Sequence, residues 1–249
     1  MAELKIPTEM IELPSKGLVY PKDNPLSEGT IEMRYMTAKH EDILTNTNYM
    51  KQGILFDRLL QSLIVTKINF NDLIVADKDA ILIAARVLGY GKDYKIKYLN
   101  PNIEEQEDFT IDLSLLENKN VDYSMFKNKN EFKFTLPNSG NEVTFKLLTH
   151  ADEKKIDDDI KTNKKLNISS QITSKLKYSI TSVNGDSEQK AIRTFVDEYL
   201  LASDARALRD YIKDVTPGLD LIFTFVGSDG YIEEGVEIPI GVSFFYPAL

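Results

Sequence analysis

The sequence contains no cysteine, only two histidines and no long uninterrupted apolar run. The absence of cysteine excludes disulfides, thiolate zinc ligands and cysteine nucleophiles, and it fits a reducing compartment. No apolar segment approaches the roughly 20 residues that span a bilayer, so we expect no transmembrane helix. The charged N-terminus carries Pro7 and does not resemble a signal peptide. We therefore expect a soluble, intracellular protein.

The composition that remains is that of an ordinary folded chain. Its 249 residues are 42% hydrophobic and 28% charged, which indicates one large domain or two small ones. Thirty basic residues against 39 acidic ones give a net charge of −9, without a long basic block. This balance argues against a sequence-independent interaction with nucleic acid phosphates.

One order of elements occurs twice along the chain. The first half contains a Leu-Pro turn, an alternating strand and a helix that Thr37 opens, and the second half repeats this order with Thr149. The turns lie at 13–17 and 136–140, and the strands are predicted over 31–36 and 143–148. The pattern predicts two related lobes.

The longer helices and the hairpins after them repeat at a constant spacing. Helices are predicted from Asp77 to Leu88 and from Asp204 to Asp214, at an offset of 127 residues, with glycines 89 and 91 ending the first. At the same offset, Tyr94, Ile96 and Tyr98 correspond to Leu221, Phe223 and Phe225. We predict an α+β fold of two internally repeated lobes (strand, helices, β-hairpin) related by pseudo-two-fold symmetry. The alternative is that the order recurs by chance, because many α+β chains show it.

The composition also divides the chain. Residues 1–30 are predicted as an extended N-terminal arm because prolines interrupt them, and the Asn- and Lys-rich segment 115–135 as a linker. The remaining units are the first repeat (31–114), the second repeat (136–240) and an aromatic C-terminal tail (241–249).

No pattern indicates catalysis. His40 and His150 each follow a threonine cap and lie among carboxylates, which could suggest metal or acid–base chemistry, but acids are favoured at any helix start. The carboxylates of Asp157, Asp158 and Asp159 diverge on a helix, so they form no cation site. We predict no catalytic residue, no cofactor and no metal, with a histidine-dependent enzyme as a remaining alternative.

The two chain ends are unusually apolar. Residues 9–21 are apolar but interrupted by prolines, and residues 238–249 concentrate aromatic side chains. They either pack against their own lobes or contact a partner protein. The candidate partner-binding residues are Leu13, Leu18, Tyr20, Phe244, Phe245 and Tyr246.

Several motifs, in this order, resemble the baseplate hub assembly chaperone family of T-even-type tailed bacteriophages. They are the opening segment 11–21, the strand leading into Met36-Thr37, Gly89-Tyr90-Gly91 before a hairpin, and the close at 238–247. The resemblance implies a non-enzymatic factor that binds hub proteins during assembly in the host cytoplasm. The alternative is a structural subunit retained in the virion baseplate. The sequence does not indicate an oligomeric state.

The resemblance also implies a zinc-ribbon-like pair of hairpins, because relatives carry a Cys-x-x-Cys pair at each hairpin turn. The corresponding turns here, near 98–101 and 225–228, hold no cysteine. We therefore predict a zinc-ribbon-like hairpin pair that lacks cysteines, and we expect no zinc. If the hairpins still pair, the packing of Tyr98 and Phe225 must replace the metal.

Overall fold

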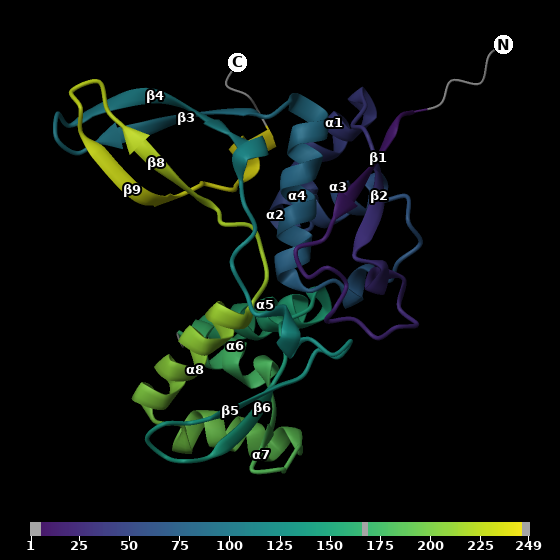
Figure 1. The fold of residues 1–249 in the computed structure, drawn as a ribbon, viewed down its shortest axis with the longest axis vertical. Coiled ribbons are helices and arrows are strands. Elements are labelled where there is room, and N and C mark those ends of the chain that lie inside the picture. The colour runs from purple at the N-terminus through teal and green to yellow at the C-terminus, as the bar shows by residue number, and fades with distance from the viewer. Residues whose placement is uncertain (1–5, 166–168, 246–249) are drawn as a thin grey trace.

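Helices and small antiparallel sheets alternate along the chain, in agreement with the α+β prediction. The structure is a computed structural model that describes residues 6–165 and 169–245. Figure 1 shows two lobes, one above the other, and two hairpins that project together to one side of the upper lobe. We call these parts lobe 1 (6–92), lobe 2 (131–217) and the hairpin arm (93–112 and 222–237).

Lobe 1 is built from one antiparallel strand pair and four helices. The strands β1 and β2 pair with Ile11 opposite Ile31. The elements are β1 (Thr8–Glu12), β2 (Thr30–Arg34), α1 (Ala38–Leu44), α2 (Thr47–Gln52), α3 (Leu55–Leu63) and α4 (Val75–Tyr90). Thr37 caps α1, as predicted.

The predicted N-terminal arm is instead part of lobe 1 over its described residues. β1 pairs with β2, and Val19 and Leu26, which follow β1, are completely buried in the core. Pro7 and Pro14 lie just outside β1, so the missing amide of proline does not interrupt the hydrogen-bond ladder. Proline therefore marks extended backbone here, but not separation from the lobe.

The two glycines predicted to end α4 have different roles. Gly91 follows the helix with a φ of 82°, a conformation that favours glycine. Gly89 lies inside the helix, where a Cβ atom would stand 2.4 Å from the sulfur of Met36. Gly89 thus allows close packing with the end of the β2 segment, and only Gly91 terminates α4.

Lobe 2 also begins with two strands followed by helices, but it has a third strand between its helices. Its strands form a three-stranded antiparallel sheet in the order β5-β6-β7. The elements are β5 (Phe132–Thr135), β6 (Glu142–Phe145), α5 (His150–Lys165), α6 (Gln171–Ser179), β7 (Ile180–Val183), α7 (Gln189–Thr194), a π-helical turn (Phe195–Tyr199) and α8 (Ala202–Val215). β5 occupies the last four residues of the segment that was predicted as a linker.

The hairpin arm consists of both predicted hairpins. They are β3 (Asp93–Asn100) with β4 (Glu105–Asp112), and β8 (Ile222–Val226) with β9 (Ile232–Glu237). Ile96 lies opposite Phe109 and Phe223 opposite Val236, so these two pairs are also 127 residues apart. α4 and α8 begin at the same offset. This common order supports the pseudo-two-fold relation, which stays a prediction.

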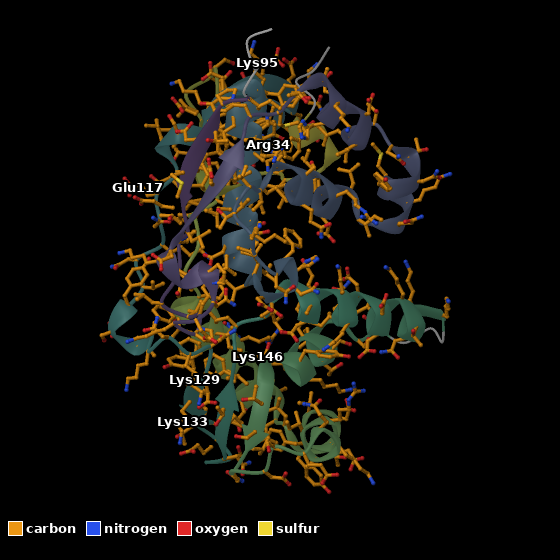
Figure 2. The ribbon with its side chains drawn as sticks, turned by 90° about the vertical axis from the view of Figure 1, so that its right-hand side faces the viewer. Arg34, Lys95, Glu117, Lys129, Lys133 and Lys146 are labelled. Carbon is orange, nitrogen blue, oxygen red and sulfur yellow. The ribbon has the colours of Figure 1, made fainter. Side chains whose placement is uncertain are left out.

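Short backbone bridges join the two lobes. The amide of Val75 donates to the carbonyl of Leu148 at 2.9 Å, and Ile74 forms an isolated bridge with Thr149. A further bridge, between Asn118 and Leu219, joins the two segments that connect lobe 2 with the hairpin arm. In Figure 2, which is turned by 90°, Glu117 marks the connecting segment, while Lys133 and Lys146 mark lobe 2. In the part of the chain that the structure describes, no helix is long and apolar enough to cross a membrane.

Candidate interaction surfaces

The N-terminal candidate residues close the core of lobe 1. Leu13 and Tyr20 are buried and Leu18 is half-buried. The hydroxyl of Tyr20 donates to Asp77 at 2.6 Å and accepts from the amide of Ile74 at 3.1 Å. Burial raises the pKa of this hydroxyl, and the neighbouring Asp77 raises it further. The segment is thereby fixed to the start of α4.

The C-terminal candidate residues also pack into lobe 1. Phe244 and Phe245 lie in a 3₁₀ turn (Val242–Phe245) and are completely buried. The ring of Phe244 stands 4.8 Å from that of Tyr94, and Phe245 stands 5.6 Å from Phe56. This segment thus fills a space between α3 and β3.

A buried arginine holds the C-terminal segment in place. Arg86 on α4 is almost completely buried, and its Nε donates to the carbonyl of Phe244 at 2.7 Å. Its other nitrogens donate to the carbonyls of Gly91 and Asp93 at 2.8 and 3.2 Å. Burial lowers the pKa of the guanidinium. Arg86 therefore ties the end of α4, the start of β3 and the C-terminal turn together.

The burial of the six candidate residues bears on the prediction that the chain ends contact a partner. Four of the six candidate residues are buried within the chain, and Tyr246 lies outside the described residues. Of the two alternatives for the chain ends, packing against their own chain is the one seen in this structure. Contact of these residues with a partner stays a prediction, and it requires the segments to be released. Apolar composition predicts burial, but it does not say which surface covers a segment.

His40 belongs to the start of α1. Its Nδ1 accepts a hydrogen bond from the amide of Thr37 at 2.9 Å, which completes a capping box. Burial lowers the pKa of the imidazole. His40 thus has a structural role at the helix terminus.

His150 lies at the junction of the lobes. Its Nε2 is 3.2 Å from a carboxylate oxygen of Asp57 on α3, and its Nδ1 is 3.3 Å from Glu153 on α5. Lys78 on α4 forms an ion pair with Glu153. Burial acts to lower the pKa of His150, but the contacts with Asp57 and Glu153 outweigh it and raise the pKa. The cluster connects α3, α4 and α5 electrostatically.

The same cluster changes the pKa of Glu153 in the opposite direction. Burial acts to raise that pKa, but the hydrogen bond with His150 and the charge of Lys78 lower it to about 2. Sequence spacing could not show this cluster, because Asp57 and Lys78 are distant from residue 150 along the chain. Among the described residues, no group of three or more histidine, aspartate or glutamate side chains has an arrangement that could hold a metal ion.

A cavity of about 440 Å³ lies beside this junction, between α4, α5 and α8. Its wall is mainly apolar, with contributions from residues such as Ile74, Ile156 and Ile212. Burial raises the pKa of Asp79, which lies on the wall, to about 6. The cavity can accept an apolar group, and Lys119, Glu153 and Lys175 add charged groups to its wall.

Aromatic rows hold the two hairpins of the arm together. The rings of Tyr98 and Phe225 are 4.7 Å apart, and those of Phe109 and Phe223 stack at 5.3 Å. The prediction that Tyr98 and Phe225 pack together at the paired hairpins is confirmed. Such aromatic pairs stabilise an interface beyond the burial of their area.

Polar groups connect the turns at the tip of the arm. The buried Asn100 donates from Nδ2 to Asp229 at 2.9 Å and to Glu107 at 3.0 Å. Glu107 also accepts from the amide of Ser228 at 3.1 Å, and Asn102 donates to Asp229. Donors at Ser228 and Asn100 lower the pKa of Glu107, and those at Asn102 and Asn100 lower the pKa of Asp229.

This network lies at the turns where relatives are expected to carry cysteines. A zinc ribbon needs thiolate or imidazole ligands, and the turns here supply amides and carboxylates in hydrogen bonds with one another. The zinc-ribbon-like character predicted for this cysteine-free pair is therefore not confirmed. Direct hydrogen bonds join the two turns instead.

Comparison with known proteins gives one match. A family model with the description "T4 bacteriophage base plate protein" matches residues 8–216, which include nearly all of both lobes and the β3–β4 hairpin. No curated protein and no solved structure matches the chain.

Proposed function

We propose that this chain, which belongs to the T4 bacteriophage base plate protein family, is a non-enzymatic factor that binds baseplate hub proteins during assembly. The family match over residues 8–216 is the observation that carries the proposal. A member of a baseplate family works in the virion or in its assembly, and its partners are other phage proteins. Action in the host cytoplasm and later release are the specific parts of the proposal.

The packing of the chain ends supports a factor that exists free before and after it acts. Such a protein must stay folded and dispersed without its partner. Phe244 and Phe245 are buried within the chain, and a net charge of −9 disfavours self-association. A factor that binds the assembly-competent form of a hub protein more tightly raises the population of that form by its differential affinity.

A structural subunit retained in the virion baseplate is the second candidate. The hairpin arm in Figure 1 favours it, because a projection whose two hairpins are joined by aromatic contacts suits a permanent contact between subunits. Both candidates need an interface with another phage protein, so copy number distinguishes them.

Quantitative mass spectrometry of purified phage particles and of infected-cell lysate tests the proposal. An assembly factor is abundant in the lysate and absent from particles. A fixed copy number in particles would replace this proposal with the structural-subunit candidate.

The proposed contact through the chain ends has its own test. Deletion of residues 241–249 removes Phe244 and leaves Arg86 without one carbonyl partner, so lost binding alone would not identify a contact. Leu18→Ser is the better variant, because Leu18 is only half-buried. Binding that survives both changes, with folding checked by thermal denaturation, would exclude the chain ends from the interface.

A further inference from the structure

We infer that the outer face of the β8–β9 hairpin docks onto a basic, partly apolar surface of a partner protein. The inference rests on the proposed function only in taking the partner from the baseplate proteins of the same phage. A released factor and a retained subunit would use the same face.

The first observation is the apolar surface of this hairpin. Phe223 and Phe225 point toward the other hairpin, so strand alternation turns Ile222 and Val226 outward. Ile222 and Val226 are 43% and 55% exposed, and Ile232, directly opposite Val226, is 60% exposed. Five of the eleven exposed large apolar residues in the described part of the chain belong to the arm, and three of them lie on this face.

The second observation is the distribution of charge. The hairpin arm contains ten acidic residues and two lysines, so it carries eight of the nine net negative charges of the chain. Residues 222–237 contain four acidic residues and no basic one. The fold thus gathers a modest overall charge into one projecting element. A surface of this kind attracts and orients a basic partner.

The acidic residues of β8–β9 divide between the two faces. Asp229 and Glu233 point inward and accept hydrogen bonds from Asn100 and Tyr98. Glu237 is opposite the outward Ile222, and Glu234 is exposed, so both are left for a partner on the outer face. The face therefore combines an apolar centre with acidic groups beside it.

The outer face of β3–β4 is different. Lys95 and Lys97 on β3 are exposed there, opposite Thr110 and Asp108. Figure 2 shows Lys95 at the upper end of the molecule. Because this face mixes both signs of charge, it lacks the single-sign surface that selects a basic partner. It supplies the control for the experiment.

The hydrogen bonds at the tip make the arm suitable for docking. Asn100, Glu107, Ser228 and Asp229 join the two turns before any partner arrives. A surface that is already ordered loses little conformational entropy when it binds. The acidic surface also disfavours phosphate-rich ligands, which leaves a protein surface as the occupant.

Site-specific photo-crosslinking tests the surface in the full chain. A benzophenone amino acid is placed at Val226, at Ile232 or, as the control, at Leu99, which is 56% exposed on the opposite outer face. After irradiation of cells that are assembling phage, we expect adducts from the first two positions with a lysine- and arginine-rich surface of another baseplate protein. The yield from Leu99 should be about tenfold lower.

A matched pair of charge reversals tests the electrostatic part. Glu234→Lys and Asp108→Lys change the net charge equally on opposite faces. We expect Glu234→Lys to reduce the adduct from Ile232 roughly five- to tenfold and Asp108→Lys to change it less than twofold. Thermal denaturation checks that both variants are folded.

Several results would overturn the inference. They are equal adduct yields from Leu99 and Val226, equal effects of the two charge reversals, an adduct with a second copy of this chain, or an adduct with an acidic surface. The copy number in particles is measured separately, so failure of this inference and failure of the proposed function are distinguishable.

Discussion

Asp77 in lobe 1 and Asp204 in lobe 2 occupy corresponding positions, yet the two lobes shift their pKa values in opposite directions. Each is the third residue of its helix, α4 or α8, and each carboxylate accepts hydrogen bonds from the Leu-Pro turn of its own lobe. Both side chains are completely buried. The two lobes thus place a carboxylate at the same position of the helix but in different surroundings.

The difference lies in what covers each carboxyl group. Burial in the core of lobe 1 raises the pKa of Asp77, against the hydrogen bonds from Ser15 and Tyr20. Burial acts in the same direction on Asp204, but donors at Ser139 and Asn138, on an exposed turn, outweigh it and lower the pKa. Position along a helix therefore predicts the contact, while depth in the lobe decides the charge state that the fold prefers.

Replacing Asp77 or Asp204 by alanine should give the largest difference in stability between the two sites. Asp77→Ala leaves the Ser15 amide and hydroxyl and the Tyr20 hydroxyl without their acceptor in the core, so we expect it to lower the free energy of unfolding by about 4 kcal/mol. Asp204→Ala should cost less, because water can reach the donors of its exposed turn. Urea denaturation of both variants measures the difference. An equal loss would contradict the difference in depth.

Replacement by asparagine should reverse this order, so that the loss of stability is smaller at position 77 than at position 204. Two of the three donors to Asp77 are hydroxyl groups, at Ser15 and Tyr20, which can turn and accept from an amide. Asp204 accepts from the backbone amides of Asn138 and Ser139, which can only donate. We expect Asp77→Asn to cost about 1 kcal/mol in unfolding free energy and to be tolerated better than Asp204→Asn. Greater loss at position 77 would refute the argument.

The pH dependence of stability should separate the two carboxyl groups. The folded-state pKa of Asp77 is raised, so its contribution is present below the ordinary value of 3.8 and is lost as the pH rises through the folded value. The pKa of Asp204 is lowered, so its contribution is present above 3.8 and is lost as the pH falls through the folded value. Asp204→Asn should therefore flatten the acid loss of stability, and Asp77→Asn should not. Urea denaturation in steps from pH 2.5 to 7 tests this.

The two histidines should give the smallest effects, again of opposite sign. His150 has a raised pKa, so its contribution is present below 6.5 and is lost as the pH rises through the folded value. His40 has a lowered pKa, so its contribution is present above 6.5 and is lost as the pH falls. Between pH 5.5 and 8, His150→Gln should remove a loss of stability with rising pH, and His40→Gln should remove a gain. Titration of the two imidazole resonances by NMR checks both directions.

Local patterns predicted most of the elements. Threonine caps marked the starts of α1 and α5, and the 127-residue spacing matched the starts of α4 and α8. It also matched the cross-strand pairs of both hairpins as far as the register shift between Phe223 and Phe225. These features depend on neighbours in the chain, so one sequence is enough to find them. The comparison of His40 with His150 was less successful. The third residue of α5 is Asp152, which bonds Thr149 as His40 bonds Thr37.

What the sequence could not supply depends on contacts between distant segments. The residues around position 150 do not predict the contact of His150 with Asp57, and those around position 244 do not predict the hydrogen bond from Arg86. The concentration of acidic residues on the hairpin arm was equally hidden, because its two halves are separated by all of lobe 2. Tertiary packing brings these groups together, and periodicity within a short window does not report it.

The hydrogen bond between Arg86 and Phe244 has a consequence for biosynthesis. It joins residues 158 positions apart, and the aromatic side chains that complete lobe 1 come after the whole of lobe 2. A ribosome that makes the chain from its N-terminus exposes α4 long before Phe244 and Phe245 have been translated. Lobe 1 therefore remains open on one side during most of synthesis, and it closes only when the C-terminal turn arrives. A prematurely terminated product would leave the Arg86 guanidinium without one of its partners and lobe 1 open on that side, which favours unfolding and degradation.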